Sequence, residues 1–143
     1  SQVGAALIMI PRAVTDTHPL IWVVKGQLKR LGRDARRFFE SVDSGESVLL
    51  IPTMVLVEIG EAAHRNKVGF AGQRFADWLV TIATIPNYQI LPLTLDVVLI
   101  AESLHAIPER GDRLIAATAM VHGCPLITRD PEIARVADLP LLW

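Results

Sequence analysis

Short, continuous apolar runs alternate along the chain with longer segments in which apolar residues recur at helical spacing. Continuous apolar runs separated by helices are typical of a parallel sheet that is covered on both faces. The predicted strands are residues 13–15, 47–51, 89–91, 125–128 and 139–142. The predicted helices are residues 19–25, 33–42, 54–65, 72–83, 95–104, 112–122 and 131–136. The pattern predicts an α/β protein with three α/β/α layers around a central, mostly parallel sheet.

The alternation continues over the whole chain without a repeat or a linker, so residues 1–143 are expected to form a single domain. At 143 residues and 51% hydrophobic, the chain is long and apolar enough to bury a core. Residues 1–12 precede the first strand and are expected to be a flexible or artificially appended extension, without the basic start of a signal peptide. Prolines interrupt the uncharged stretch 78–95, which argues against a membrane span. We therefore expect a cytoplasmic protein.

The charge balance limits how the chain could bind nucleic acid. Fourteen Lys and Arg residues oppose fifteen Asp and Glu residues, which gives a formal net charge of -1. Binding through bulk positive charge alone is excluded, because counterion release requires many cations. A nuclease site built from carboxylates and metal ions is compatible with this balance. Six of the fourteen cations lie within residues 25–37, where they either grip phosphates or form a solvated face.

Cysteine and histidine suggest no metal site. The single cysteine, Cys124, excludes a disulfide framework and a cysteine-based zinc cluster, and we expect it in the core. The four histidines show no metal-ligand spacing and are expected to form local hydrogen bonds; His18 lies closest to a candidate acid. The candidate chemistry therefore rests on acidic residues.

Four acids occupy positions where ligand sites or buried charges are expected. Asp16 and Asp130 follow predicted parallel strands, and ligand sites lie beyond the carboxyl ends of such strands. Glu58 lies in an apolar helix, where a carboxylate must be neutral, paired with an arginine or bound to a metal. Asp112 opens another apolar helix. The simpler alternatives are a turn at Asp16 and helix caps at Asp112 and Asp130.

Three segments carry a family resemblance: VTDTHPLIW, VLVEIGEA and GDRLIAATAMVHGCPLITRDPEI. Together they resemble PIN-domain ribonucleases, specifically the VapC-type toxins of toxin–antitoxin modules, over residues 14–136. The resemblance implies that Asp16, Glu58, Asp112 and Asp130 form a catalytic, metal-binding acidic quartet. It also implies that the Thr128 hydroxyl contacts metal-bound water or phosphate.

Two further residues near the quartet are candidates for a supporting role. Glu109 stands where the family often has an aspartate, and it is one methylene longer. Arg113 adjoins Asp112 and either pairs with a site carboxylate or contacts RNA. Crowded carboxylates require a cation, and ligands that are all oxygen favour Mg²⁺ or Mn²⁺.

The resulting hypothesis is a metal-dependent endoribonuclease, the toxin of a type II toxin–antitoxin system, that hydrolyses RNA phosphodiester bonds with metal-activated water. The alternative is a non-catalytic adaptor of the same fold that binds RNA or protein. The resemblance implies an RNA substrate, a cognate antitoxin protein and a homodimer. Residues 21–24 and 55–56 either contact the antitoxin or pack in the core, and Trp22 is expected in the core or an interface.

Overall fold

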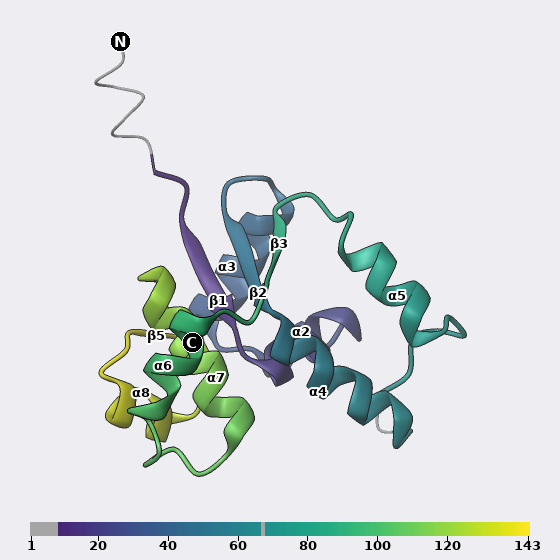
Figure 1. The fold of residues 1–143 in the computed structure, drawn as a ribbon. Helices are drawn as coiled ribbons and strands as arrows, with labels where there is room; N and C mark the ends of the chain where they lie inside the picture. The colour runs from purple at the N-terminus through teal and green to yellow at the C-terminus, as the bar shows by residue number, and fades with distance from the viewer. Residues whose placement is uncertain (1–8, 67) are drawn as a thin grey trace.

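The computed structural model describes residues 9–66 and 68–143 (Figure 1). Most of the expected N-terminal extension, residues 1–8, lies outside the described residues. The first strand begins at Arg12, one residue earlier than predicted. Within the described residues, no helix is both long enough and apolar enough to span a membrane.

Five parallel strands form the central sheet. Their order is β3-β2-β1-β4-β5, and each neighbouring pair runs in the same direction. The central strand is β1, whose Val14 lies opposite Leu50 on one side and Leu126 on the other. The strands are β1 (Arg12–Thr15), β2 (Val48–Pro52), β3 (Tyr88–Leu91), β4 (Leu126–Ile127) and β5 (Leu141–Leu142). The predicted parallel α/β sheet is confirmed.

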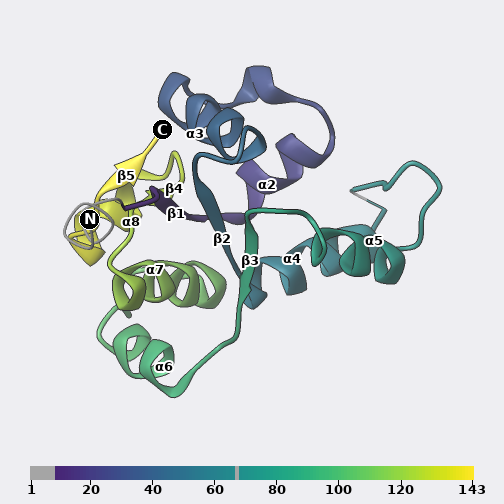
Figure 2. The ribbon, with the colours of Figure 1, turned by 90° about the horizontal axis from the view of Figure 1, so that it is seen from above.

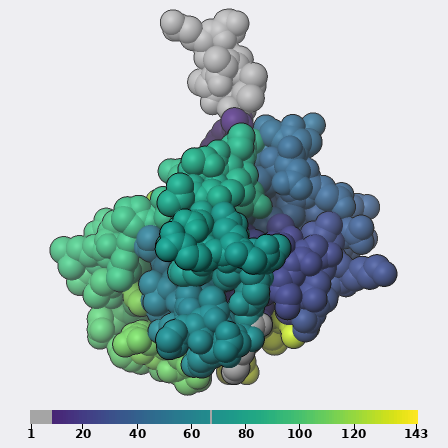
Figure 3. Space-filling view, turned by 90° about the vertical axis from the view of Figure 1, so that its right-hand side faces the viewer, coloured from purple at the N-terminus to yellow at the C-terminus, as the bar shows by residue number. Residues whose placement is uncertain are grey.

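Helices cover both faces of this sheet (Figure 2). Helices α2 and α3 lie on one face and α6 and α7 on the other, while α5 packs outside α4 (Figure 3). The helices are α2 (Thr17–Val24), the 3-10 turn η1 (Leu28–Arg30), α3 (Arg33–Asp43), α4 (Thr53–His64), α5 (Phe75–Ile82), α6 (Leu95–Glu102), α7 (Arg110–His122) and α8 (Pro131–Ala137). The three predicted layers are therefore present, and η1 is the element that the apolar pattern did not predict.

The core forms where these layers meet. Leu49, Leu50 and Ile51 of β2 are fully buried, as expected for a strand covered on both faces. Small side chains of α7, including Ala116 and Ala117, are also fully buried and allow this helix to approach the sheet. Cys124 and Trp22 are buried as predicted, and Val55 and Leu56 are buried as well. The core alternative is thus correct for residues 55–56, which have little surface left for an antitoxin.

The chain order creates a gap between two loops at the carboxyl edge of the sheet. After β1 the chain forms β2 and β3 on one side of this strand. The helices α6 and α7 then connect β3 to β4, which lies on the other side of β1. The loops that follow β1 and β4 therefore leave neighbouring strands in opposite directions. Such a switch point is where open parallel sheets bind ligands.

Candidate functional site

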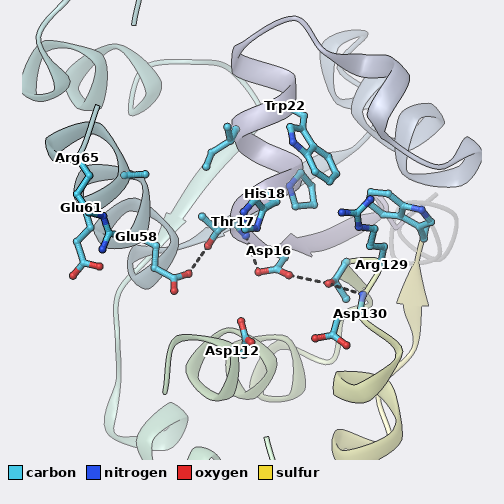
Figure 4. A pocket seen from close by; sticks show the side chains of 15 residues that line it. Asp16, Thr17, His18, Trp22, Glu58, Glu61, Arg65, Asp112, Arg129 and Asp130 are labelled. Carbon is cyan, nitrogen blue, oxygen red and sulfur yellow. Dashed lines mark hydrogen bonds between the residues drawn. The ribbon is translucent and has the colours of Figure 1, made fainter. Parts of the chain in front are cut away.

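A pocket of about 500 Å³ opens at this switch point (Figure 4). Its lining brings together all four predicted acids and the predicted hydroxyl residue. They come from the segments that directly follow β1 and β4 and from the helices α4 and α7. The lining residues are Asp16, Thr17, His18, Pro19, Ile21, Trp22, Glu58, Glu61, Ala62, Arg65, Asp112, Thr128, Arg129, Asp130 and Trp143. The pocket therefore collects acids that are distant in the sequence.

Hydrogen bonds fix both carboxylate oxygens of Asp16. Oδ1 accepts from the backbone N–H of Thr17 at 2.8 Å, and Oδ2 accepts from the hydroxyl of Thr128 at 2.8 Å. The backbone N–H of Asp16 donates to the carbonyl of Ile127, which aligns the ends of β1 and β4. Asp16 is also the N-cap of α2, so the suggested turn is a helix start, and its carboxylate still lines the pocket.

Asp130 combines the two roles that its sequence position suggested. It is the N-cap of α8, where its Oδ1 accepts from the N–H of Glu132 at 3.0 Å and Pro131 occupies the first turn. Its own N–H donates to the Thr128 hydroxyl at 3.2 Å. Capping uses one carboxylate oxygen, and Asp130 nevertheless lines the pocket. The capping interpretation is therefore correct and does not remove this acid from the site.

Glu58 projects from α4 towards the start of α7. Its Oε1 accepts the hydroxyl proton of Thr17 at 2.5 Å, and none of the ion pairs among the described residues involves Glu58. The arginine-pairing alternative is therefore wrong. A methyl group at Gly111 would lie 2.3 Å from Oε2, so the absence of a side chain there makes room for the carboxylate. Burial, followed by the charges of Asp16 and Glu61, raises the pKa of Glu58.

Asp112 is the least compensated acid of the pocket. The helix α7 begins at Arg110, two residues before Asp112, so the alternative that Asp112 caps the helix is wrong. Among the described residues, its carboxylate accepts no hydrogen bond. Burial and then repulsion from Asp16, Glu58, Asp130 and Glu109 raise the pKa of Asp112 from 3.8 to about 6. A bound cation would remove this penalty.

The two predicted supporting residues do not line the pocket. Glu109 is exposed at the N-cap position of α7 and acts on Asp112 through its charge alone. Arg113 donates from Nη1 to the carbonyls of Ile107 and Pro108 at 2.8 and 2.9 Å, and so it ties down the loop before α7. Of the two alternatives for Arg113, pairing with a site carboxylate is not found among the described residues, because its guanidinium donates to the backbone.

Sequence reasoning missed several residues of the pocket wall. Glu61 and Arg65 follow Glu58 by three and seven residues, a helical spacing that places all three on one face of α4 and that could have revealed them. Thr17 reaches Glu58 from the first turn of α2. Trp143 reaches the pocket from the far end of the chain, and no local sequence signal predicts that contact.

The acids fit a hard divalent cation by their chemistry. Every candidate ligand is a carboxylate or hydroxyl oxygen, the type that Mg²⁺ and Mn²⁺ prefer. Asp112, half-buried and repelled by four other acids, supplies the excess negative charge that a cation would neutralise. Within the described part of the chain, no three His, Cys, Asp or Glu side chains are already arranged in metal-ligand geometry. The acids therefore suit a divalent cation by the type of their ligand atoms and by their negative charge.

Comparisons with known proteins agree with this fold. Residues 13–139 match the family model of the PIN domain. A VapBC2 structure from Rickettsia felis, bound to a DNA fragment from its promoter, aligns with a TM-score of 0.67 and 14% identity over 91% of this chain and 96% of that chain. FitAcB from Neisseria gonorrhoeae aligns with a TM-score of 0.65 and 16% identity over 92% and 96%.

A toxin–antitoxin complex from Klebsiella pneumoniae aligns with a TM-score of 0.57 and 19% identity over 85% of this chain and 89% of that chain. No curated protein sequence matches the chain. The structural likenesses concern the fold, whereas the family match spans most of the sequence. The chain belongs to the PIN domain family.

Proposed function

We propose that the protein is a metal-dependent endoribonuclease and the toxin of a type II toxin–antitoxin pair, acting in the cytoplasm. The observation that carries the nuclease proposal is the convergence of Asp16, Glu58, Asp112 and Asp130 on one pocket at the switch point of the sheet. The raised pKa of Asp112 supports the proposal, because burial and the neighbouring acids disfavour its charged form unless a cation is bound. Membership of the PIN family, whose domains are generally nucleases, supports the same reaction class.

The residues divide the work according to how each is held. We assign Asp16, Glu58 and Asp112 as direct ligands of Mg²⁺ or Mn²⁺ and Asp130 as a contact through water. When bound, such an ion activates water as the nucleophile and stabilises charge on the leaving oxygen of the phosphodiester. Thr128 orients Asp16 through one hydrogen bond and Asp130 through another, and Thr17 orients Glu58. These bonds keep three acids facing the pocket before substrate arrives.

The antitoxin and homodimer proposals are supported by the relatives and by the surface. The aligned structures include a VapBC2 protein and a toxin–antitoxin complex. Large apolar side chains remain exposed on and just before α6, where Leu95 is 72% and Leu99 60% accessible. A partner that covered them would bury the kind of patch that monomers seldom expose. A non-catalytic adaptor of the same fold remains the alternative, and it would gain nothing from a divalent cation.

Cleavage of RNA by the purified full chain tests the nuclease proposal. We expect Mn²⁺ to support cleavage, EDTA to stop it, and Asp16→Ala to reduce its rate by more than the roughly 10–100-fold that outer-shell changes cost. The matched control is Asp96→Ala, because Asp96 is an exposed acid on α6 outside the pocket. Equal cleavage by the unaltered chain and Asp16→Ala, with or without EDTA, would overturn the nuclease proposal.

A further inference from the structure

Two arginines from distant parts of the chain converge on one tryptophan at the edge of the pocket. The guanidinium carbon of Arg129, in the loop after β4, lies 5.2 Å from the ring centroid of Trp22 in α2. The guanidinium carbon of Arg30, at the end of η1, lies 4.6 Å from the same ring. Both arginines are exposed, whereas Trp22 is only 4% accessible. The ring is therefore covered, and the cationic groups face the solvent.

Neither of these arginines is neutralised by a carboxylate. Among the described residues, the ion pairs of the basic segment 25–37 use Arg33 and Arg36, which pair with Asp34 and Glu40. Arg30 and Arg129 form no ion pair there, although Arg129 directly precedes an acid of the pocket. Their two guanidinium carbons lie within about 10 Å of each other, close to the Debye length at 0.1 M salt. The two positive charges therefore act together on a nearby anion.

Packing around Trp22 holds the arginines in place. A cation above an indole face is attracted by the electrons of the ring, which restricts an otherwise mobile side chain. Trp143 packs edge-on against the same indole, with ring centroids 6.0 Å apart at 65°. Trp22 is thus a positioning residue: it does not offer a free face for a nucleobase, and it orients two planar guanidinium groups, which suit phosphate oxygens.

The opposite wall of the pocket carries another cation. Arg65, the residue directly after α4, lies on the far side of the acids from Arg129 (Figure 4). Across the pocket the charges therefore run from Arg65 through the acids to Arg129, and Arg30 lies behind this wall on the Trp22 ring. A nucleic-acid strand cut at the acids must continue past both walls, and its neighbouring phosphates would then meet these arginines.

We propose that Arg30 and Arg129, held on Trp22, bind the backbone phosphate of a single-stranded RNA next to the phosphate that is cleaved. This proposal rests on the nuclease function for its substrate class. It gives Arg129 a role in RNA binding, and it selects Arg30 from the basic segment as the cation that contacts Trp22 of the pocket lining. Contact with backbone phosphate carries no base preference, so affinity should depend on salt and little on sequence.

Fluorescence anisotropy with a labelled single-stranded RNA tests this assignment. The full chain carries Asp16→Ala to prevent cleavage, and Kd is measured over a range of NaCl concentrations with Mg²⁺ present. Arg129→Gln and Arg30→Gln should each weaken binding about fivefold at 0.1 M salt and lower the slope of log Kd against log salt by about 0.7. The control Arg135→Gln removes a charge from exposed α8, outside the pocket, and should leave the slope unchanged.

Equal slopes for Arg129→Gln and Arg135→Gln would overturn the proposal. Loss of affinity for an oligoglutamate peptide, with RNA affinity retained, would overturn it in favour of an acidic polypeptide. In the chain with Asp16 intact, Arg129→Gln should raise KM about fivefold and leave kcat unchanged. The reason is that the lost contact stabilises the bound substrate and the transition state equally. Arg129→Lys should restore the salt slope. Binding that depends on Arg129 without any cleavage would overturn the nuclease function alone.

Discussion

The pocket has two halves that hold their carboxylates in different ways. At the strand ends, Asp16 receives two hydrogen bonds, and Asp130 uses one oxygen to cap a helix. On the helix side, Glu58 receives one hydrogen bond and Asp112 receives none among the described residues. The pKa values of both helix-side acids are raised, principally by burial.

The strand-end acids and the helix-side acids therefore contribute different things to a cation site: the first are oriented in advance, and the second carry uncompensated negative charge. The strand-end half is organised in advance by backbone and hydroxyl donors, so its acids keep their direction whether or not a cation is present. The helix half carries desolvated negative charge that few donors stabilise. A divalent cation would therefore gain its geometry from Asp16 and much of its electrostatic stabilisation from Glu58 and Asp112.

Removing the hydroxyl that links the two strand-end acids should produce the largest loss of RNA cleavage or Mn²⁺ affinity. Thr128 is 2% accessible, donates to Asp16 and accepts from the N–H of Asp130. Thr128→Val should lower RNA cleavage or Mn²⁺ affinity about 10–100-fold, as losses of such orienting partners do. Thr118→Val is the control, because Thr118 is equally buried but donates to its own helix at Leu114. Equal losses in the two variants would refute the orienting role.

A methyl group at Gly111 should disturb the helix half without touching the strand ends. Its carbon would lie 2.3 Å from Oε2 of Glu58, so the carboxylate must move. Gly111→Ala should reduce the rate of RNA cleavage about tenfold. The same variant is titrated with Mn²⁺, and the concentration that gives half of the thermal stabilisation is measured. Gly111 lies in the first turn of α7, where alanine stabilises a helix by at most the roughly 1 kcal/mol over glycine that applies to a helix interior. Unchanged cleavage together with that gain in stability would show that Glu58 does not need the space.

The third prediction concerns folding stability and its change with pH. The pKa of Asp112 rises from 3.8 to about 6 on folding, so the folded chain holds this proton more tightly than the unfolded chain. The ionised carboxylate therefore costs stability progressively as pH rises from about 4 to 6, and the cost is complete above that window. Without divalent cations, Asp112→Asn should raise the free energy of unfolding by about 2 kcal/mol near pH 7.5.

Urea denaturation across this pH range measures the effect. The advantage of Asp112→Asn should shrink as pH is lowered through 6 towards 4, because Asp112 becomes protonated in the native state. Asp96→Asn, on exposed α6, provides the comparison for loss of an ordinary surface acid. A constant difference between Asp112→Asn and the unaltered chain at every pH would contradict the raised pKa.

Much of the fold could be predicted because its strands are continuous apolar runs and its helices end at recognisable residues. Gly123, for example, adopts a left-handed conformation directly after α7, as a glycine that ends a helix commonly does. The helix over 72–83 is shorter than predicted, since α5 begins only at Phe75. Helix starts were also harder to place: α7 begins two residues before Asp112, which moves that acid from the cap into the first turn.

The site could be predicted where an acid violates its local pattern, as at Glu58 in an apolar helix, or follows a buried strand, as at Asp16. What could not be predicted depends on contacts between distant segments. The stack of Arg30 and Arg129 on Trp22 joins three elements, and nothing near any of these residues in the sequence indicates it. Arg113 shows the converse, since adjacency to Asp112 did not direct its side chain into the pocket.

Calorimetric titration of the full chain with Mn²⁺ tests the central claim, that the acids form a cation site, most directly. Near pH 6 we expect saturable binding accompanied by proton release, visible as a heat that depends on the buffer, because Asp112 must lose its proton to bind. Asp112→Asn should reduce the proton release and weaken binding. The absence of saturable binding, or the same heat and proton release in Asp112→Asn, would contradict the account.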